Sequence, residues 1–184
     1  MLVCDDARVI EVRAERDEDR PAIGAVVAAA FGSEAEADLV ERIRASPEYV
    51  AEMALVAVRD GRVVGHVMVS GATLVHAASE RPIVMLSPLA VDPAEQRSGV
   101  GSALVRAVTA IADARGEPLV VLEGSPAYYG RLGFVAAADH GIELPLPDWA
   151  PPDAAQVMPL TAYDPDDPTL RGRIAYPSSF DGLD

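Results

Sequence analysis

One stretch decides the fold of this chain: Met85-Leu86-Ser87-Pro88-Leu89-Ala90-Val91, then the pair Asp92-Pro93, then Gln96-Arg97-Ser98-Gly99-Val100-Gly101. The first run is apolar and predicts a strand, and Asp92-Pro93 is typical of the turn that ends one. Beyond the glycines, an amphipathic helix is predicted by apolar residues at helical spacing, namely Val100, Leu104, Val108 and Ile111. Gly116 is the expected end of that helix. The stretch therefore predicts a strand, a glycine-rich turn and a helix, in that order.

A glycine-rich turn at the N-terminus of a helix favours an anion, because free backbone N–H groups and the positive end of the helix dipole meet there. Gly99 and Gly101 also carry no side chain that would hold a phosphate away from the backbone. Two common nucleotide motifs do not fit. A P-loop needs Lys-Ser/Thr where Ser102-Ala103 stands, and a dinucleotide fingerprint needs a third glycine at Leu104. A turn that only starts a well-packed helix is the alternative interpretation.

Two motifs carry a resemblance to a known family. The pattern Q-x-x-G-x-G directly after a strand resembles the pyrophosphate-binding motif of the GNAT superfamily of acetyl-CoA-dependent N-acetyltransferases. The segment Tyr129-Gly130-Arg131-Leu132-Gly133-Phe134 resembles the Y-x-R/K-x-G-F signature of the same superfamily. Between the two motifs, Leu119-Val120-Val121-Leu122 predicts a buried parallel strand. The two motifs at this spacing are far more specific than either alone, and together they cover the middle third of the chain.

The resemblance implies a mixed α/β fold (α+β) with a central mixed sheet that is splayed at the coenzyme site and has helices on both faces. A chain of 184 residues suits one domain, so we expect a single acetyltransferase domain over 1–184 that includes the C-terminal strands and loops of 138–184. The remaining periodicity predicts the following elements: a strand at Val9–Arg13, a helix capped by Asp17 or Asp19, a second helix at Ser33–Arg44, a hairpin of Met53–Val58 with Val63–Val69, and a last hairpin of Gln156–Tyr163 with Leu170–Tyr176.

Pro88 stands in the middle of the predicted strand, where a proline cannot complete a central ladder. The strand is therefore an edge or contains a bulge, and its apolar character favours the bulge. A bulge would leave backbone groups of Leu89, Ala90 and Val91 in need of partners. In GNAT proteins the pantetheine arm of the coenzyme pairs in this gap like an extra strand. Packing alone is the alternative explanation of Pro88.

The resemblance implies acetyl-CoA as the acyl-donor co-substrate and no metal. It assigns coenzyme binding to the strand and the turn: Leu89, Ala90, Val91, Gln96, Arg97, Ser98, Gly99, Val100, Gly101 and Ser102. Each charge-assisted hydrogen bond from a backbone N–H to the pyrophosphate would contribute ~1.5–3 kcal/mol. Arg97 has an alternative interpretation as a solvated surface charge. The chain departs from the family in one loop, because Glu123-Gly124-Ser125-Pro126 stands where many members have an asparagine that contacts the coenzyme.

Direct transfer of acetyl to an amine needs a neutral amine. For a lysine-like amine with a pKa of ~10.4, deprotonation at pH 7 costs about 4.6 kcal/mol, so a base or a desolvating pocket is required. Glu123 at the end of its strand is the first candidate base and His66 the second, with an exposed strand end and a core histidine as the alternatives. Tyr129 holds the tyrosine position of the signature and would donate a hydrogen bond to the departing thiolate, while Tyr128 would pack elsewhere.

Composition narrows the partners. The formal net charge of −14 excludes a nucleic-acid binder of the usual kind and agrees with a cationic substrate, although acidic surfaces also serve solubility. Cys4 is the only cysteine, which excludes an internal disulfide and favours the cytoplasm, and no apolar stretch is long enough to cross a bilayer. A homodimer stays open.

The sequence thus predicts an acetyl-CoA-dependent N-acetyltransferase acting on a primary amine of a small molecule or peptide. The alternative is a non-catalytic acyl-CoA-binding sensor or partner module on the same fold, and an unrelated α/β binding domain would require both motif matches to be coincidences. Aminoglycosides, polyamines, amino acids and protein N-termini are all open as acceptors, and the acyl group can be longer than acetyl.

Overall fold

The computed structural model describes residues 9–182. Cys4, on which the expectation of a cytoplasmic location rests, lies outside these residues. The helices of the described part are α1 (Arg20–Phe31), α2 (Ala35–Arg44), α3 (Val100–Ala114) and the short α4 (Pro126–Tyr129). The strands are β1 (Glu11–Ala14), β2 (Ala54–Arg59), β3 (Arg62–His76), β4 (Ser79–Val91), β5 (Leu119–Glu123), β6 (Val135–Ala136), β7 (Ile142–Glu143), β8 (Ala155–Pro159) and β9 (Gly172–Ala175).

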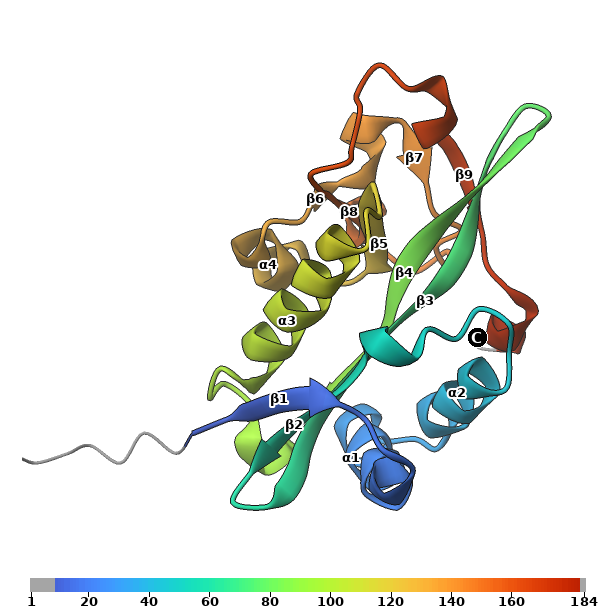
Figure 1. The fold of residues 1–184 in the computed structure, drawn as a ribbon. Coiled ribbons are helices and arrows are strands. Elements are labelled where there is room, and N and C mark those ends of the chain that lie inside the picture. The colour runs from blue at the N-terminus through green and yellow to red at the C-terminus, as the bar shows by residue number, and fades with distance from the viewer. Residues whose placement is uncertain (1–8, 183–184) are drawn as a thin grey trace, which may run out of the picture.

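The strands form one open, mostly antiparallel sheet in the order β1-β2-β3-β4-β5-β8-β6, and β9 pairs with β3 and β7. Parallel pairing is limited to β4 with β5 and to β7 with β9. The long hairpin of β3 and β4 runs through the middle of the molecule and projects at one end, where β9 lies beside it (Figure 1). The parallel β4–β5 pair has α3 as its crossover, as a βαβ unit requires.

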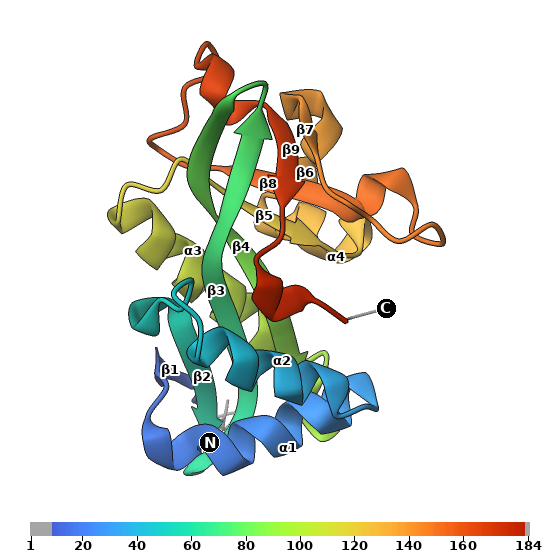
Figure 2. The same cartoon turned by 90° about the vertical axis from the view of Figure 1, so that its right-hand side faces the viewer.

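Helices cover both faces of the sheet, as expected (Figures 1 and 2). The pair α1 and α2 packs on one face through Ile23, Val27 and Ile43. Helix α3 packs on the other face through the apolar stripe that its sequence predicts, which includes Leu104 and Val108. Within residues 9–182, no helix is long and apolar enough to cross a membrane. The sheet is thus buried on two sides, and its functional openings lie where strands separate.

The bulge at Pro88 is confirmed. In the β3–β4 ladder Val67 faces Leu89 while Val69 faces Leu86, so β4 carries one extra residue at Ser87-Pro88. The Ser87–Pro88 peptide bond is cis. Strand β4 pairs with β5 only at Val84 and Met85, and beyond Met85 its β5-facing edge has no partner strand among the described residues. The splay predicted for the sheet therefore lies between β4 and β5.

One expectation for the termini is wrong and another is met only in part. The segments around β8 and β9 do not pair with each other: β8 pairs with β5 and β6, whereas β9 pairs with β3 and β7. The reason is that β3 extends to His76, seven residues further than predicted, and its far end offers an edge to β9. Asp19 does occupy the N-cap position of α1, but its carboxylate makes no capping hydrogen bond to the helix and binds the guanidinium of Arg13 at 2.7 Å instead.

Candidate active site

The N-terminus of α3 is an open set of backbone donors. Helical hydrogen bonding starts with the N–H of Ala103, which donates to the Gly99 carbonyl at 3.0 Å, so the three preceding N–H groups of residues 100–102 have no intrahelical acceptor. Gly99 has a φ of +87°, a left-handed conformation that disfavours any side chain, and Arg97 has a φ of +61°. This backbone turns its amides and the positive end of the helix toward one point, where an anion is stabilised.

The loop before α3 is held in place by side-chain hydrogen bonds and an ion pair. The hydroxyl of Ser98 donates to the Glu95 carbonyl at 2.6 Å, and the amide of Gln96 donates to the carbonyl of Val91 at 3.3 Å. Arg59, from the β2–β3 turn, pairs with the carboxylate of Glu95. The hydroxyl of Ser98 therefore helps to fix the loop.

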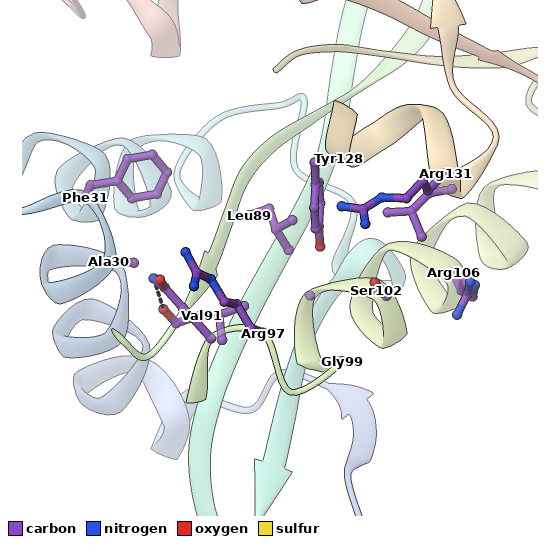
Figure 3. A pocket seen from close by; sticks show the side chains of 13 residues that line it. Ala30, Phe31, Leu89, Val91, Arg97, Gly99, Ser102, Arg106, Tyr128 and Arg131 are labelled. Carbon is purple, nitrogen blue, oxygen red and sulfur yellow. Dashed lines mark hydrogen bonds between the residues drawn. The ribbon is translucent and has the colours of Figure 1, made fainter. Parts of the chain in front are cut away.

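A cleft of about 820 Å³ opens in front of these amides (Figure 3). Seven of the ten residues expected to hold the coenzyme line it: Leu89, Val91, Gln96, Arg97, Gly99, Gly101 and Ser102. The other three side chains lie elsewhere. Ala90 is buried on the α1–α2 side of the sheet, Val100 is buried between α3 and the sheet, and Ser98 holds the loop.

Cations surround this cleft although the chain is strongly acidic. Arg97, Arg106 and Arg131 all line it, from the turn, from α3 and from the segment after α4 (Figure 3). Arg106 and Arg131 are not among the coenzyme-binding residues predicted from the sequence. A signal for both was present, because Arg106 lies one helical turn after Ser102 and Arg131 is the basic residue of the Y-x-R-x-G-F pattern. The arrangement suits a ligand with several phosphates.

The two adjacent tyrosines of α4 point in different directions, and the structure reverses our expectation for Tyr128. Tyr128 lines the cleft, and its hydroxyl oxygen lies where a Cβ at residue 101 would approach within 2.4 Å (Figure 3). Tyr129 instead packs against the ring of Phe134, with centroids 5.6 Å apart. Burial raises the pKa of Tyr129 above its usual range, so its phenol keeps its proton and remains a hydrogen-bond donor.

Glu123 lies at the end of β5, beside a second cleft of about 450 Å³. Its carboxylate accepts a hydrogen bond from the hydroxyl of Tyr176, which follows β9. Burial raises the pKa of the Tyr176 phenol, as does its bond to this carboxylate, so the phenol acts as the donor. A carboxylate in a cleft at the point where two strands separate is well placed to accept a proton.

His66 is fully buried on the face of the sheet that α1 and α2 cover, and it lines neither cleft. Its Nε2 lies 2.9 Å from the carboxylate of Glu15, which also accepts from Arg44 at 2.7 Å and from the Tyr49 hydroxyl at 2.9 Å. Burial lowers the pKa of His66, outweighing the effect of Glu15. The structure does not bring His66 together with Glu123 and Tyr129.

Within residues 9–182, no cluster of His, Cys, Asp and Glu side chains could hold a metal ion. The features that meet a ligand are instead the amides of α3, the three arginines and the free edge of β4. These fit a long, phosphate-bearing acyl carrier: the amides and cations face phosphates, and an extended arm can pair with the strand edge. The residues of the chain thus fit acetyl-CoA.

Comparison with known proteins identifies the family. Residues 11–137, more than half of the chain, match the model of the acetyltransferase (GNAT) domain. Among curated proteins, the uncharacterised N-acetyltransferase YhbS of Escherichia coli K12 is 34% identical over 137 residues, covering 74% of this chain and 80% of YhbS. The uncharacterised N-acetyltransferase YjhQ of the same strain is 34% identical over 119 residues, covering 64% of this chain and 66% of YjhQ.

Solved structures agree. The crystal structure of E. coli YhbS in complex with CoA matches with a TM-score of 0.83 and 30% identity, covering 100% of this chain and 98% of that one. A GNAT family acetyltransferase from Brucella melitensis in complex with acetyl-CoA matches with a TM-score of 0.74 and 30% identity, covering 95% and 99% of the two chains. This chain therefore belongs to the GNAT family of N-acetyltransferases, and is an acyltransferase.

Proposed function

We propose that the protein transfers the acetyl group of acetyl-CoA to a primary amine of a small molecule or peptide, by direct attack of the amine on the thioester. The observation that carries this proposal is the meeting of two features in one cleft: the free amides at the start of α3 and the unpaired edge of β4. The relatives solved with CoA and acetyl-CoA support the donor. We also propose the cytoplasm as the site of action, on the cysteine content of the chain.

The coenzyme would be held in two parts. The N–H groups of residues 100–102 would meet the pyrophosphate, with Arg97, Arg106 and Arg131 supplying positive charge around it. The edge from Leu89 to Val91 would pair with the pantetheine arm, which brings the acyl group toward the bulge at Pro88. When bound, acetyl-CoA supplies the activated acyl group, and the chain supplies position, polarisation and proton transfer.

Glu123 is our candidate for the base that takes the proton of the amine. It lies on the strand that leaves β4 at the bulge, and its carboxylate lines the second cleft. His66 is a poor candidate for the base, because its Nε2 is bonded to Glu15 and its ring has no exposed surface. Deprotonation of a lysine-like amine at pH 7 costs about 4.6 kcal/mol. A carboxylate that accepts the proton, together with the removal of water from the amine in the cleft, would lower this cost.

Tyr129 remains our candidate donor to the departing thiolate, because its buried phenol stays protonated. Its ring packs over Gly124, where a Cβ would come within 2.3 Å of Cε2, so Gly124 is required for this position. We propose a separate role for Tyr128: contact with the bound coenzyme next to Gly101.

The test is release of free CoA from acetyl-CoA in the presence of a panel of primary amines. The 15 lysine and arginine positions of the chain are all arginines, so no lysine side chain can be acetylated and the α-amino group is the one primary amine of the given sequence. Background self-acetylation is therefore limited to one group. We expect Glu123→Gln to abolish most turnover while acetyl-CoA binding is retained. Coenzyme binding without turnover of any amine would favour the alternative, an acyl-CoA-binding module.

A further inference from the structure

The second cleft lies end to end with the first along β4. Leu89 and Val91 line the first cleft, whereas Met85, Leu86 and Ser87 line the second, so only Pro88 separates the two sets in sequence. Consecutive Cα atoms lie about 2.9 Å apart across a cis and about 3.8 Å apart across a trans peptide bond, so Ser87 and Leu89 are at most about 7 Å apart. An acyl group carried along the edge of β4 would thus arrive at the mouth of the second cleft.

The walls of the second cleft are apolar and its charge is negative. The loop Pro145-Leu146-Pro147 and the ring of Phe180 form walls, and Glu123 is the single carboxylate among the described lining residues. Within the described part of the chain no arginine lines this cleft, whereas three line the first cleft. Its volume of about 450 Å³ falls within the roughly 300–1,000 Å³ of small-molecule sites. These walls disfavour an acceptor with several charges or hydroxyl groups, since each polar group buried here would lack a partner.

The wall that carries Phe180 is built from the end of the described chain and is held in place. Phe180 is 9% exposed, and its ring lies 5.6 Å from that of Tyr176. The guanidinium of Arg42, on α2, donates to the carbonyl of Asp181 at 2.7 Å. Tyr176 in turn donates to Oε1 of Glu123, which leaves Oε2 as the oxygen available to an amine. The C-terminal segment therefore supplies both an apolar wall and the orientation of the carboxylate.

We propose that the second cleft is the acceptor site, that its acceptor is a small primary amine on an apolar body, and that Tyr176 is the positioning residue of Glu123. The inference rests on the proposed acetyl transfer and adds the class of acceptor. Glu123 takes one proton from the ammonium group. The amine nitrogen then forms a bond to the acyl carbon as the carbon–sulfur bond breaks, and the electron pair of that bond stays on sulfur. The second proton leaves the nitrogen and the sulfur takes up one proton, which gives the amide and free CoA.

The first experiment compares amines of different polarity. The probes are 2-phenylethylamine, which has an apolar body, and putrescine, which carries a second cation. We expect saturable calorimetric binding of 2-phenylethylamine to the CoA-loaded protein, and a kcat/KM with acetyl-CoA at least about tenfold above that of putrescine, because burial of an aromatic ring contributes this much or more. No binding of 2-phenylethylamine at 10 mM, or a preference for putrescine, would overturn the proposal.

The second experiment separates the apolar wall formed by Phe180 from the orientation of Glu123 by Tyr176. Phe180→Leu should raise the KM for 2-phenylethylamine about three- to tenfold with kcat largely kept, since the apolar wall is reduced. Tyr176→Phe retains the ring and removes the donor, so the KM for 2-phenylethylamine should be largely kept while kcat falls about three- to tenfold, because Glu123 loses the hydrogen bond that orients its carboxylate. Tyr163→Phe is the matched control: its hydroxyl bonds His140 at 2.9 Å and lines neither cleft, so it should change neither measurement.

Calorimetry with acetyl-CoA alone distinguishes a failure of the proposed acceptor site from a failure of the proposed acetyl transfer. If the wild-type protein binds acetyl-CoA but not 2-phenylethylamine, only the proposed acceptor site is contradicted. Failure of the wild-type protein to bind acetyl-CoA contradicts the proposed function itself. An unchanged kcat in Tyr176→Phe, with amine binding intact, would contradict the positioning role of Tyr176.

Discussion

Tyr128 and Tyr129 are neighbours on one helix, yet their side chains have different surroundings and different proposed roles. Adjacent residues on a helix point about 100° apart, so the side chains of Tyr128 and Tyr129 meet different surroundings. The family signature directed attention to Tyr129, and the geometry adds Tyr128, which lines the cleft beside Gly101. The sequence could not reveal this second role, because it depends on the angle at which α4 meets α3.

Paired phenylalanine variants test this division. Tyr129→Phe should lower kcat by about 10- to 1,000-fold with little change in acetyl-CoA affinity, because it removes a donor to developing charge on sulfur. Tyr128→Phe should mainly raise the Kd for acetyl-CoA, by about three- to tenfold, through loss of one hydrogen bond. The two quantities are measured by initial rates and by calorimetry. The reverse pattern would assign the thiolate to Tyr128.

At the scale of elements, one glycine allows α3 to approach the sheet. A Cβ at Gly65 in β3 would lie 2.8 Å from Cγ1 of Val100 and 2.9 Å from Cδ1 of Leu104. Gly65→Ala should therefore destabilise the protein by about 1–3 kcal/mol through overpacking, measured as a lower midpoint of urea unfolding. Gly24→Ala is the control, because a Cβ at residue 24 meets nothing within 4 Å. Equal midpoints for Gly65→Ala and the wild-type protein would contradict this close packing.

The elements differ in how well the sequence predicts them. The sequence predicts the unit from the bulge of β4 to β5 closely, because Pro88, the glycines and the stripe of α3 are local signals with a direct structural meaning, but β4 itself begins at Ser79, six residues before the predicted start. The pairing of β8 and β9 was not, because each short strand takes whichever sheet edge the rest of the fold leaves open. The second cleft was missed for the same reason: Glu123 was predicted, but its partner Tyr176 comes from a segment whose placement depends on that pairing.

At the scale of the whole molecule, a buried polar cluster links β1, α2 and β3. The carboxylate of Glu15 binds both Arg44 and His66, and all three side chains are nearly fully buried. Burial alone would raise the pKa of Glu15, but the hydrogen bonds from Arg44 and His66 hold it well below its usual range. Since Glu15 accepts from Nε2 of His66, that nitrogen carries a proton, and the Nδ1 of a neutral ring is left without a partner among the described residues.

Stability should fall as the pH falls. The pKa values of His66 and Glu15 are both lower in the folded state, so the unfolded chain binds more protons. The contribution of His66 to the free energy of unfolding is present above its unfolded pKa of ~6.5 and is lost as the pH falls below that value. The contribution of Glu15 is lost as the pH falls below its unfolded pKa of ~4.3. The urea midpoint of the wild-type protein should decline as the pH is lowered from 7.5 to 5. The midpoint of His66→Gln, which keeps a donor to Glu15, should decline less over the same range. Identical slopes for the two proteins would contradict this account.

The central claim is that the start of α3 binds the pyrophosphate of acetyl-CoA, and calorimetry tests it most directly. Gly99→Val and Gly116→Val introduce the same side chain at left-handed positions, with φ of +87° and +82°, at opposite ends of α3, but only Gly99 lines the cleft. We predict one-to-one binding to the wild-type protein, a Kd at least about tenfold higher for Gly99→Val, and an unchanged Kd for Gly116→Val. No saturable binding at millimolar acetyl-CoA, or equal affinities for the two variants, would contradict the claim.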